Sequence, residues 1–204
     1  MKILITGFAP FGGQSINPSY EAVKALPEQI GRAEIIKAEV PVVFGKAGEV
    51  LAALMDQYRP DAVICAGQAG GRDAISLERV AINIMDASAP DNEGNQPVDQ
   101  PIVPDGPAAY FSTLPLRRME EAILDKEIPC RISNTAGTYV CNDLMYRLLH
   151  RVAETGMPAG FIHVPYLPEQ TSSEDNVPSM ELGMIVEALK TAVEVISSSD
   201  SSCE

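Results

Sequence analysis

The chain has 204 residues, of which 46% are hydrophobic and 21% charged, a balance typical of a folded globular protein rather than a disordered one. Its formal net charge is −13, so nucleic acid and anionic membrane surfaces would repel it on average, and we expect neither as a partner. No apolar run approaches the roughly 20 residues that a membrane span requires. One domain over residues 1–196 accounts for this length, and the acidic, Ser-rich residues 197–204 are expected to be a disordered tail.

Strand patterns alternate with amphipathic helix patterns along the chain, which favours one α/β sheet covered by helices on both faces. The predicted strands are residues 2–6, 33–40, 61–66, 76–85, 130–133 and 160–164. The predicted helices are residues 18–26, 45–58, 116–126, 142–154 and 179–196. Residues 87–108 are polar and rich in proline without periodicity, which predicts a long loop that is either functional or disordered.

Cysteine and histidine usage argues against metal and disulfide chemistry. The four cysteines show no CxxC pairing, and the two histidines form no HExxH motif. Only three apolar residues follow Lys2 before Thr6, too few for the core of a signal peptide. We therefore expect a reduced, cytoplasmic protein with no metal and no cofactor.

Cys141 is a candidate nucleophile because it lies within one residue of the start of the helix predicted at 142–154. A helix N-terminus carries partial positive charge and free N–H groups, which favour a thiolate and can bind a developing oxyanion. The alternative is a cysteine that merely packs in the core, which is the interpretation we give to Cys65 and Cys130. Cys203 belongs to the predicted tail.

A thiol nucleophile commonly needs an imidazole base. His150 would lie about 13 Å along the same helix and on its opposite side, out of reach of Cys141. His163 lies at the end of the strand predicted at 160–164, and α/β proteins build their sites at the carboxyl ends of strands. We therefore predict a dyad of Cys141 and His163, against the alternative that His163 is a satisfied interior side chain. These patterns do not select a third member from the 28 acidic residues.

Six short segments of the chain are distinctive in composition: Thr6–Gly13, Gly67–Arg72, Glu78–Asn83, Pro90–Gly94, Ala136–Asn142 and His163–Tyr166. They follow one another in the order found in pyrrolidone carboxyl peptidase, also called pyroglutamyl peptidase type I. The sequence resembles this family from about residue 2 to residue 170. The resemblance implies a single α/β domain with a twisted, mostly parallel (mixed) sheet, and members of the family often form homotetramers.

The resemblance also implies a reaction and a set of site residues. The reaction is removal of an N-terminal pyroglutamyl residue from a peptide through a thioester, with Cys141 as nucleophile, His163 as base and Glu78 orienting the base. The role of Glu78 comes from the resemblance alone, and its alternative is an ion pair with a neighbouring arginine. The family's substrate pocket corresponds to Phe8, Phe11, Gln68, Tyr139 and Val140.

The chain departs from the family pattern in two loops. Ala9 stands where the family usually has Asp, and Ser88 and Ala89 stand where it commonly has Arg and Ile. The second departure removes a charge and bulk from a segment that lies near the site in the family. Two alternatives to the peptidase therefore remain open: an enzyme resembling nucleoside phosphorylases, and a non-catalytic relative that binds pyroglutamyl peptides.

Overall fold

The computed structural model describes residues 1–171 and 176–198, and its main element is a sheet of seven strands. The strands along the chain are β1 (Lys2–Phe8), β2 (Gln29–Ile30), β3 (Ala33–Val40), β4 (Ala62–Gln68), β5 (Ile75–Glu78), β6 (Val80–Ile82), β7 (Ala109–Phe111), β8 (Cys130–Ser133) and β9 (Ala159–Val164). The order across the sheet is β2-β3-β1-β4-β9-β5-β8, while β6 and β7 form a separate two-stranded ribbon.

Most neighbours in this sheet are parallel. The strands β3, β1, β4 and β9 all run in one direction, and β8 is parallel to β5. Two pairs are antiparallel, β2 with β3 and β5 with β9. The prediction of a mostly parallel, mixed sheet is therefore confirmed, and the reversal between β9 and β5 is the feature that matters for the site.

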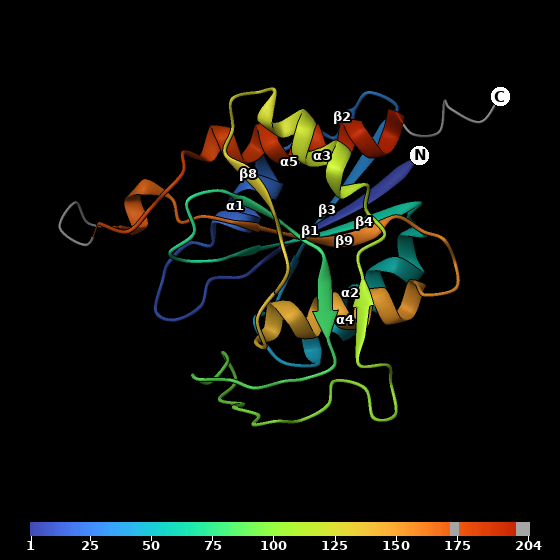
Figure 1. Cartoon of the computed structure of the whole chain (residues 1–204), viewed down its shortest axis with the longest axis vertical. Coiled ribbons are helices and arrows are strands. Elements are labelled where there is room, and N and C mark those ends of the chain that lie inside the picture. Colours follow the sequence, from blue (N-terminus) through green and yellow to red (C-terminus); the bar gives the residue numbers. More distant parts are fainter. Residues whose placement is uncertain (172–175, 199–204) are drawn as a thin grey trace.

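Helices cover both faces of the sheet (Figure 1). They are α1 (Pro18–Ala25), α2 (Lys46–Tyr58), α3 (Leu116–Leu124), α4 (Val140–Val152) and α5 (Leu182–Ser198). The helices α1, α3 and α5 pack on one face, and α2 and α4 pack on the other. A short 3₁₀ helix, η1 (Pro168–Gln170), follows β9. In the part of the chain that the structure describes, none of the helices combines the length and apolarity needed to cross a bilayer.

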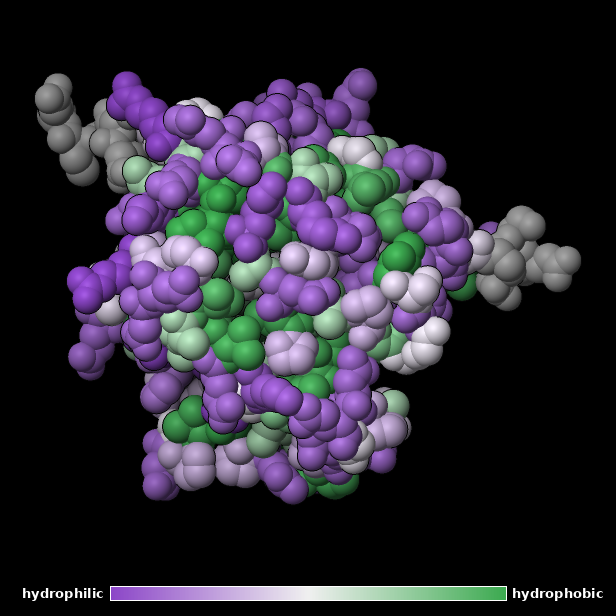
Figure 2. All heavy atoms as spheres, turned by 180° about the vertical axis from the view of Figure 1, so that it is seen from behind, coloured by the Kyte–Doolittle hydropathy of each residue, from purple (hydrophilic) through white to green (hydrophobic). Residues whose placement is uncertain are grey.

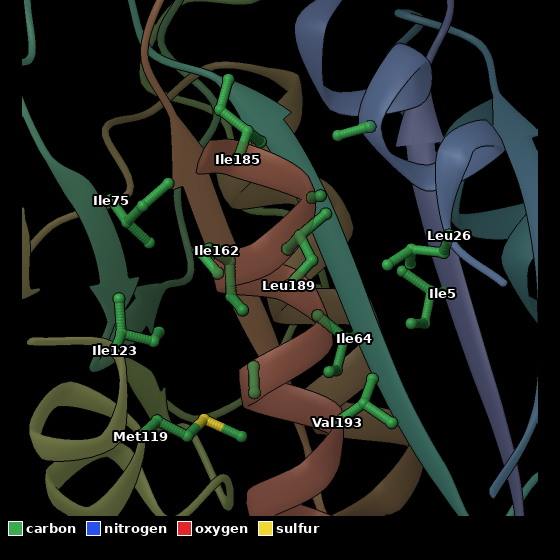
Figure 3. Packing of buried hydrophobic residues seen from close by; sticks show 14 of the residues in the cluster. Ile5, Leu26, Ile64, Ile75, Met119, Ile123, Ile162, Ile185, Leu189 and Val193 are labelled. Carbon is green, nitrogen blue, oxygen red and sulfur yellow. The ribbon is translucent and has the colours of Figure 1, made fainter. Parts of the chain in front are cut away.

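The larger core lies between the sheet and α5. Side chains four residues apart on α5, at Ile185, Leu189 and Val193, point toward Ile64 of β4 and Ile162 of β9 (Figure 3). All five side chains are fully buried. Burying a side chain of this size contributes about 2 kcal/mol, so this layer holds the parallel strands β4 and β9 firmly side by side.

The predicted elements differ from the structure mainly at their ends; the helix predicted at 142–154, for example, spans Val140–Val152. The strand predicted at 76–85 is interrupted at Arg79. The backbone N–H of Arg79 still donates to the carbonyl of Ser133 at the end of β8, but the carbonyl of Arg79 accepts from the backbone N–H of Ser112. The chain therefore passes at this residue from the main sheet to the two-stranded ribbon. The helix predicted at 179–196 begins at Leu182 and ends at Ser198. Residues 199–204 of the predicted tail lie outside the described residues. The short strands β2 and β7 were not predicted.

The start of α1 matches its sequence signal and fixes the loop before it. The side chain of Asn17 caps the helix by accepting from the N–H of Ser19, and Pro18 takes the first helical position. The helix lies so close to β1 that a Cβ on Gly7 would be 2.5 Å from the Cα of Tyr20. Glycine at position 7 is therefore required by the contact between two backbones.

This close approach can be tested with two glycine-to-alanine variants. Gly7→Ala should lower the free energy of unfolding by about 3 kcal/mol, because neither the strand nor the helix backbone can move independently of its layer. Gly183→Ala is the matched control: Gly183 is on α5 with no atom within 4 Å of an added Cβ, so the change should be neutral or stabilising. Urea unfolding curves of the two variants measure the difference, and equal stabilities would contradict the close contact.

Candidate active site

The predicted base and its partner come together on the face of the sheet that α4 covers. His163 is the second-to-last residue of β9, and its cross-strand neighbours are Gly67 on β4 and Ser76 on β5. Glu78 lies opposite Phe161 of β9, two residues from His163 and therefore on the same face. The antiparallel pairing of β5 with β9 thus brings together two side chains that are 85 residues apart in the sequence.

A buried hydrogen bond joins these two side chains. The Nδ1 of His163 donates to the Oε1 of Glu78 over 2.7 Å, and the two residues are 4% and 0% exposed. A carboxylate can only accept, so Nδ1 carries the proton and Nε2 of the neutral ring has a free lone pair. This is the tautomer that a general base requires.

Arg72 forms an ion pair with the same carboxylate. Its Nη1 donates to the same Oε1 of Glu78 over 2.6 Å, and its Nη2 donates to the carbonyl of Thr135 over 3.1 Å. Burial alone would raise the pKa of Glu78, but hydrogen bonds from His163 and Arg72 lower it below its usual value. Glu78 is therefore an anion at neutral pH, and it forms both the contact with histidine and the alternative contact with an arginine.

Cys141 lies over these strands, on the face of the sheet that α4 covers. It is the second residue of α4, whose N-cap residue, Tyr139, provides no side-chain hydrogen bond to the first turn. Its Sγ lies 3.0 Å from the point that a Cβ on Gly67 would occupy. Because Gly67 and His163 are paired across β4 and β9, the sulfur lies one strand spacing from the position of the base.

The prediction of a lowered thiol pKa is wrong for this state of the site. Burial raises the pKa of the Cys141 thiol to about 12, the negative charge of Glu78 raises it further, and the positive charge of Arg72 lowers it. Burial also lowers the pKa of His163, although the bond to Glu78 acts in the opposite direction. Both shifts favour a neutral thiol and a neutral imidazole in the resting site, because burial disfavours the charged form of each group.

A small, mostly apolar cavity of about 40 Å³ opens beside the sulfur. Its lining is Phe8, Phe11, Asn17, Val42, Gln68, Tyr139, Val140 and Cys141. All five residues that the family resemblance assigned to a substrate pocket therefore lie around one cavity with Cys141. Sequence reasoning missed Asn17 and Val42; Asn17 carried a signal, but as a helix cap rather than as a pocket residue.

Larger hollows lie elsewhere on the molecule. One of about 410 Å³ is lined by Phe44, Met85 and Arg147 among others, and includes neither Cys141 nor His163. We place the site at the smaller cavity because Cys141 lines it, and Gln68 in its wall ends β4, the strand that pairs with the His163 strand β9. Across residues 1–171 and 176–198, no group of three or more His, Cys, Asp or Glu side chains could hold a metal ion.

The remaining candidates lie away from this cavity. His150 is exposed, and its Nδ1 shares a hydrogen bond with the hydroxyl of Tyr110. Cys65 and Cys130 are buried, and burial raises the pKa of each thiol to about 12, as expected for packing residues. Cys203 lies outside the described residues.

The residues that depart from the family pattern border the site without lining its cavity. Ser88 and Ala89 are exposed on the long loop, next to Pro90, whose carbonyl accepts from the hydroxyl of Tyr139 over 3.0 Å. Ala9 contributes its carbonyl, which accepts from Asn17 over 3.0 Å. The two departures therefore adjoin pocket residues through backbone contacts.

Comparison with known proteins identifies close relatives of the whole chain. The pyroglutamyl peptidase family matches residues 1–199. The pyrrolidone-carboxylate peptidase of Thermosipho africanus is 57% identical over 198 residues, covering 96% of this chain and 97% of the relative. That of Enterococcus faecalis is 52% identical over 197 residues, covering 95% and 92%.

Solved structures show the same fold. The crystal structure of pyroglutamyl peptidase I from Bacillus amyloliquefaciens superposes with a TM-score of 0.90 at 50% identity, covering 94% of each chain. A mutant pyrrolidone carboxyl peptidase from Pyrococcus furiosus gives a TM-score of 0.92 at 48% identity, covering 96% of this chain and 97% of that one. Neither alternative, the phosphorylase-like enzyme or the non-catalytic relative, is favoured by these similarities.

The charges around the sulfur predict opposite effects of two substitutions on its alkylation by iodoacetamide. In the wild type the rate should keep rising above pH 8.5, because the thiol pKa is raised. Glu78→Gln removes a negative charge that disfavours the thiolate, so the pKa should fall and alkylation at pH 8 should accelerate, by roughly twofold to tenfold. Arg72→Met removes a positive charge that favours the thiolate, so alkylation should slow by a similar factor.

Rate constants measured from pH 6 to pH 10 would check both signs, with circular dichroism as the control for folding. A wild-type rate that levels off well below pH 8.5, or variants that shift the rate in the same direction, would contradict this account of the site.

Proposed function

The chain belongs to the pyroglutamyl peptidase family, and we propose that it releases N-terminal pyroglutamate from peptides with Cys141 as nucleophile, His163 as base and Glu78 as the group that orients His163. The observation that carries this proposal is that three elements bring their side chains to neighbouring positions on one face of the sheet. The first turn of α4 presents the thiol, β9 presents an imidazole with a free Nε2, and β5 supplies the buried carboxylate bound to its Nδ1.

The resting neutral pair suits a mechanism in which the proton moves as the sulfur attacks. The Cys141 sulfur bonds to the pyroglutamyl carbonyl carbon while its proton passes to Nε2 of His163. The oxyanion accepts hydrogen bonds from the backbone N–H groups at the start of α4, including that of Cys141. The imidazolium then protonates the leaving nitrogen as the C–N bond breaks, which leaves a thioester on Cys141.

Hydrolysis of the thioester repeats these steps with water. His163 takes a proton from the water that attacks the thioester carbonyl, and the C–S bond breaks to release pyroglutamate and restore the thiol. In both halves the buried anion of Glu78 stabilises the imidazolium that forms beside it. Arg72 keeps Glu78 ionised, so the orienting group is charged before the substrate arrives.

The chemistry of the cavity supports a lactam as the bound group. A pyroglutamyl ring is neutral and carries no ammonium group, and the walls at Phe8, Phe11 and Val140 suit its apolar carbons. None of the eight lining residues is acidic. A free N-terminal glutamine would bring an ammonium group into this cavity without a carboxylate to compensate its lost hydration, so it should be rejected.

The family membership extends the proposal to assembly and location. We propose a homotetramer, whose interface includes the outer face of the β6–β7 ribbon, where Phe111 and Ile82 are 69% and 37% exposed. Apolar side chains also reach the surface among polar ones on the rear face of the molecule (Figure 2).

We propose a cytoplasmic location for one peptidase domain over residues 1–196, because a thiol nucleophile functions in a reduced compartment.

The activity can be tested with a pyroglutamyl amide of aminomethylcoumarin. The wild type should release the fluorophore, iodoacetamide should abolish release, and Cys141→Ser should lower kcat by at least roughly 10³-fold, since a serine hydroxyl is far less acidic than a thiol. The control is Cys130→Ala, which alters a buried cysteine of β8 outside the cavity and should retain activity. Absence of release by the wild type, or release that persists in Cys141→Ser, would refute the proposal.

The assembly can be tested by light scattering after size exclusion. The wild type should have four times the mass of one chain, and Phe111→Arg should shift it to smaller species, because it places a charge in a desolvated contact. Leu124→Arg, at a 49% exposed position on α3, is the matched control and should leave the mass unchanged. A monomeric wild type would contradict the tetramer, and an unchanged Phe111→Arg variant would exclude this face.

A further inference from the structure

The side chain of Gln170 is held at both ends of its amide. Its Oε1 accepts from the backbone N–H of Leu167 over 2.9 Å, and its Nε2 donates to the Oε1 of Gln68 over 2.9 Å. A backbone N–H can only donate, so it fixes which end of the Gln170 amide is the oxygen. The NH₂ group of Gln170 must therefore face Gln68.

This contact in turn fixes which end of the Gln68 amide is the oxygen. Since Gln68 presents its oxygen to Gln170, its NH₂ group must point elsewhere. Gln68 ends β4 and lines the cavity beside Cys141. Within the described part of the chain, the Nε2 of Gln68 donates to no protein group, so this donor is left without a protein partner.

The second amide in the cavity has the same polarity. The Oδ1 of Asn17 accepts from both the N–H and the hydroxyl of Ser19, and its Nδ2 donates one hydrogen to the carbonyl of Ala9. Only the second hydrogen of Nδ2 is left over. Both amide side chains of the cavity can therefore offer donors rather than acceptors, which matches a ligand that presents a carbonyl oxygen.

We propose that Gln170 is a positioning residue that sets the polarity of the substrate cavity. By holding the oxygen of Gln68, it turns the NH₂ group of Gln68 toward the cavity, where that group donates to the ring carbonyl oxygen of an N-terminal lactam. This inference rests on the proposed function and adds to it a source of specificity. Gln170 lies on η1, seven residues beyond His163, so one connection positions both the base and this donor.

The polarity can be reversed with one substitution. In Gln170→Glu, the carboxylate still accepts from Leu167, but it can no longer donate, so it should attract the NH₂ group of Gln68 and turn the oxygen of Gln68 toward the cavity. A lactam oxygen would then meet an acceptor. Gln170→Met keeps the length of the side chain and removes both bonds, which leaves Gln68 free to rotate.

The readout is the ratio of kcat/KM for two substrates with the same coumarin leaving group. One is the pyroglutamyl amide, and the other is the cyclopentanecarbonyl amide, whose ring has no carbonyl. Gln170→Glu should lower this ratio by about tenfold or more, mainly through KM, and Gln170→Met should lower it by about threefold. Glu169→Gln, at an exposed neighbouring position on η1, is the control and should leave the ratio unchanged.

The possible outcomes distinguish failure of this inference from failure of the proposed function on which it rests. If the wild type cleaves the pyroglutamyl amide but the ratio is unchanged in both Gln170 variants, the inference is overturned and the function stands. If both substrates lose activity equally, Gln170 has only a structural role and the inference is also overturned. If the wild type does not cleave the pyroglutamyl amide, the proposed function fails, and the inference fails with it.

Discussion

The missing side chain at Gly67 allows the N-terminus of α4 to lie directly on β4. A Cβ at this position would fall 2.7 Å from the ring of Phe161, closer than side chains tolerate, and 3.0 Å from the sulfur of Cys141, which is an unusually tight contact. Any larger residue would lift α4 from the sheet or displace Phe161, which packs against His163 with ring centroids 4.8 Å apart. The close approach of Cys141 to the strand beside His163 therefore depends on the absence of a side chain at Gly67.

Burial of Glu78 disfavours its ionised form, and the positive charge of Arg72 offsets this effect. A carboxylate that is 0% exposed would tend to take up a proton, and a protonated Glu78 would be a weak partner for an imidazolium. The guanidinium of Arg72 binds the same oxygen as His163 and keeps the carboxylate ionised. Burial also raises the pKa of the Cys141 thiol, and the charge on Glu78 that Arg72 maintains raises it further.

Local patterns in the sequence were enough to predict the helices and strands. They could not predict how these elements pair with one another or how deeply packing buries a given side chain. The position of Cys141 at a helix start and that of His163 at a strand end followed from periodicity, and the structure brings them to adjoining positions. The pairing of Glu78 with His163 could not follow from such patterns, because it depends on β5 running antiparallel to β9. The thiol pKa was predicted with the wrong sign because spacing along a chain reveals a helix terminus but not how far packing removes the sulfur from water.

Two of the residues that sequence reasoning missed, Asn17 and Gln170, share one physical property: each has a side-chain amide whose orientation is set by a backbone group. Asn17 caps α1, and that role itself consumes its oxygen and leaves an N–H for the cavity. Gln170 carries no pattern of its own, yet the N–H of Leu167 determines the polarity of Gln68 through it. A neutral cavity can discriminate among neutral rings only if its few polar atoms are held in one orientation. Backbone groups supply that constraint here because, unlike side-chain amides, they cannot exchange donor for acceptor by rotating.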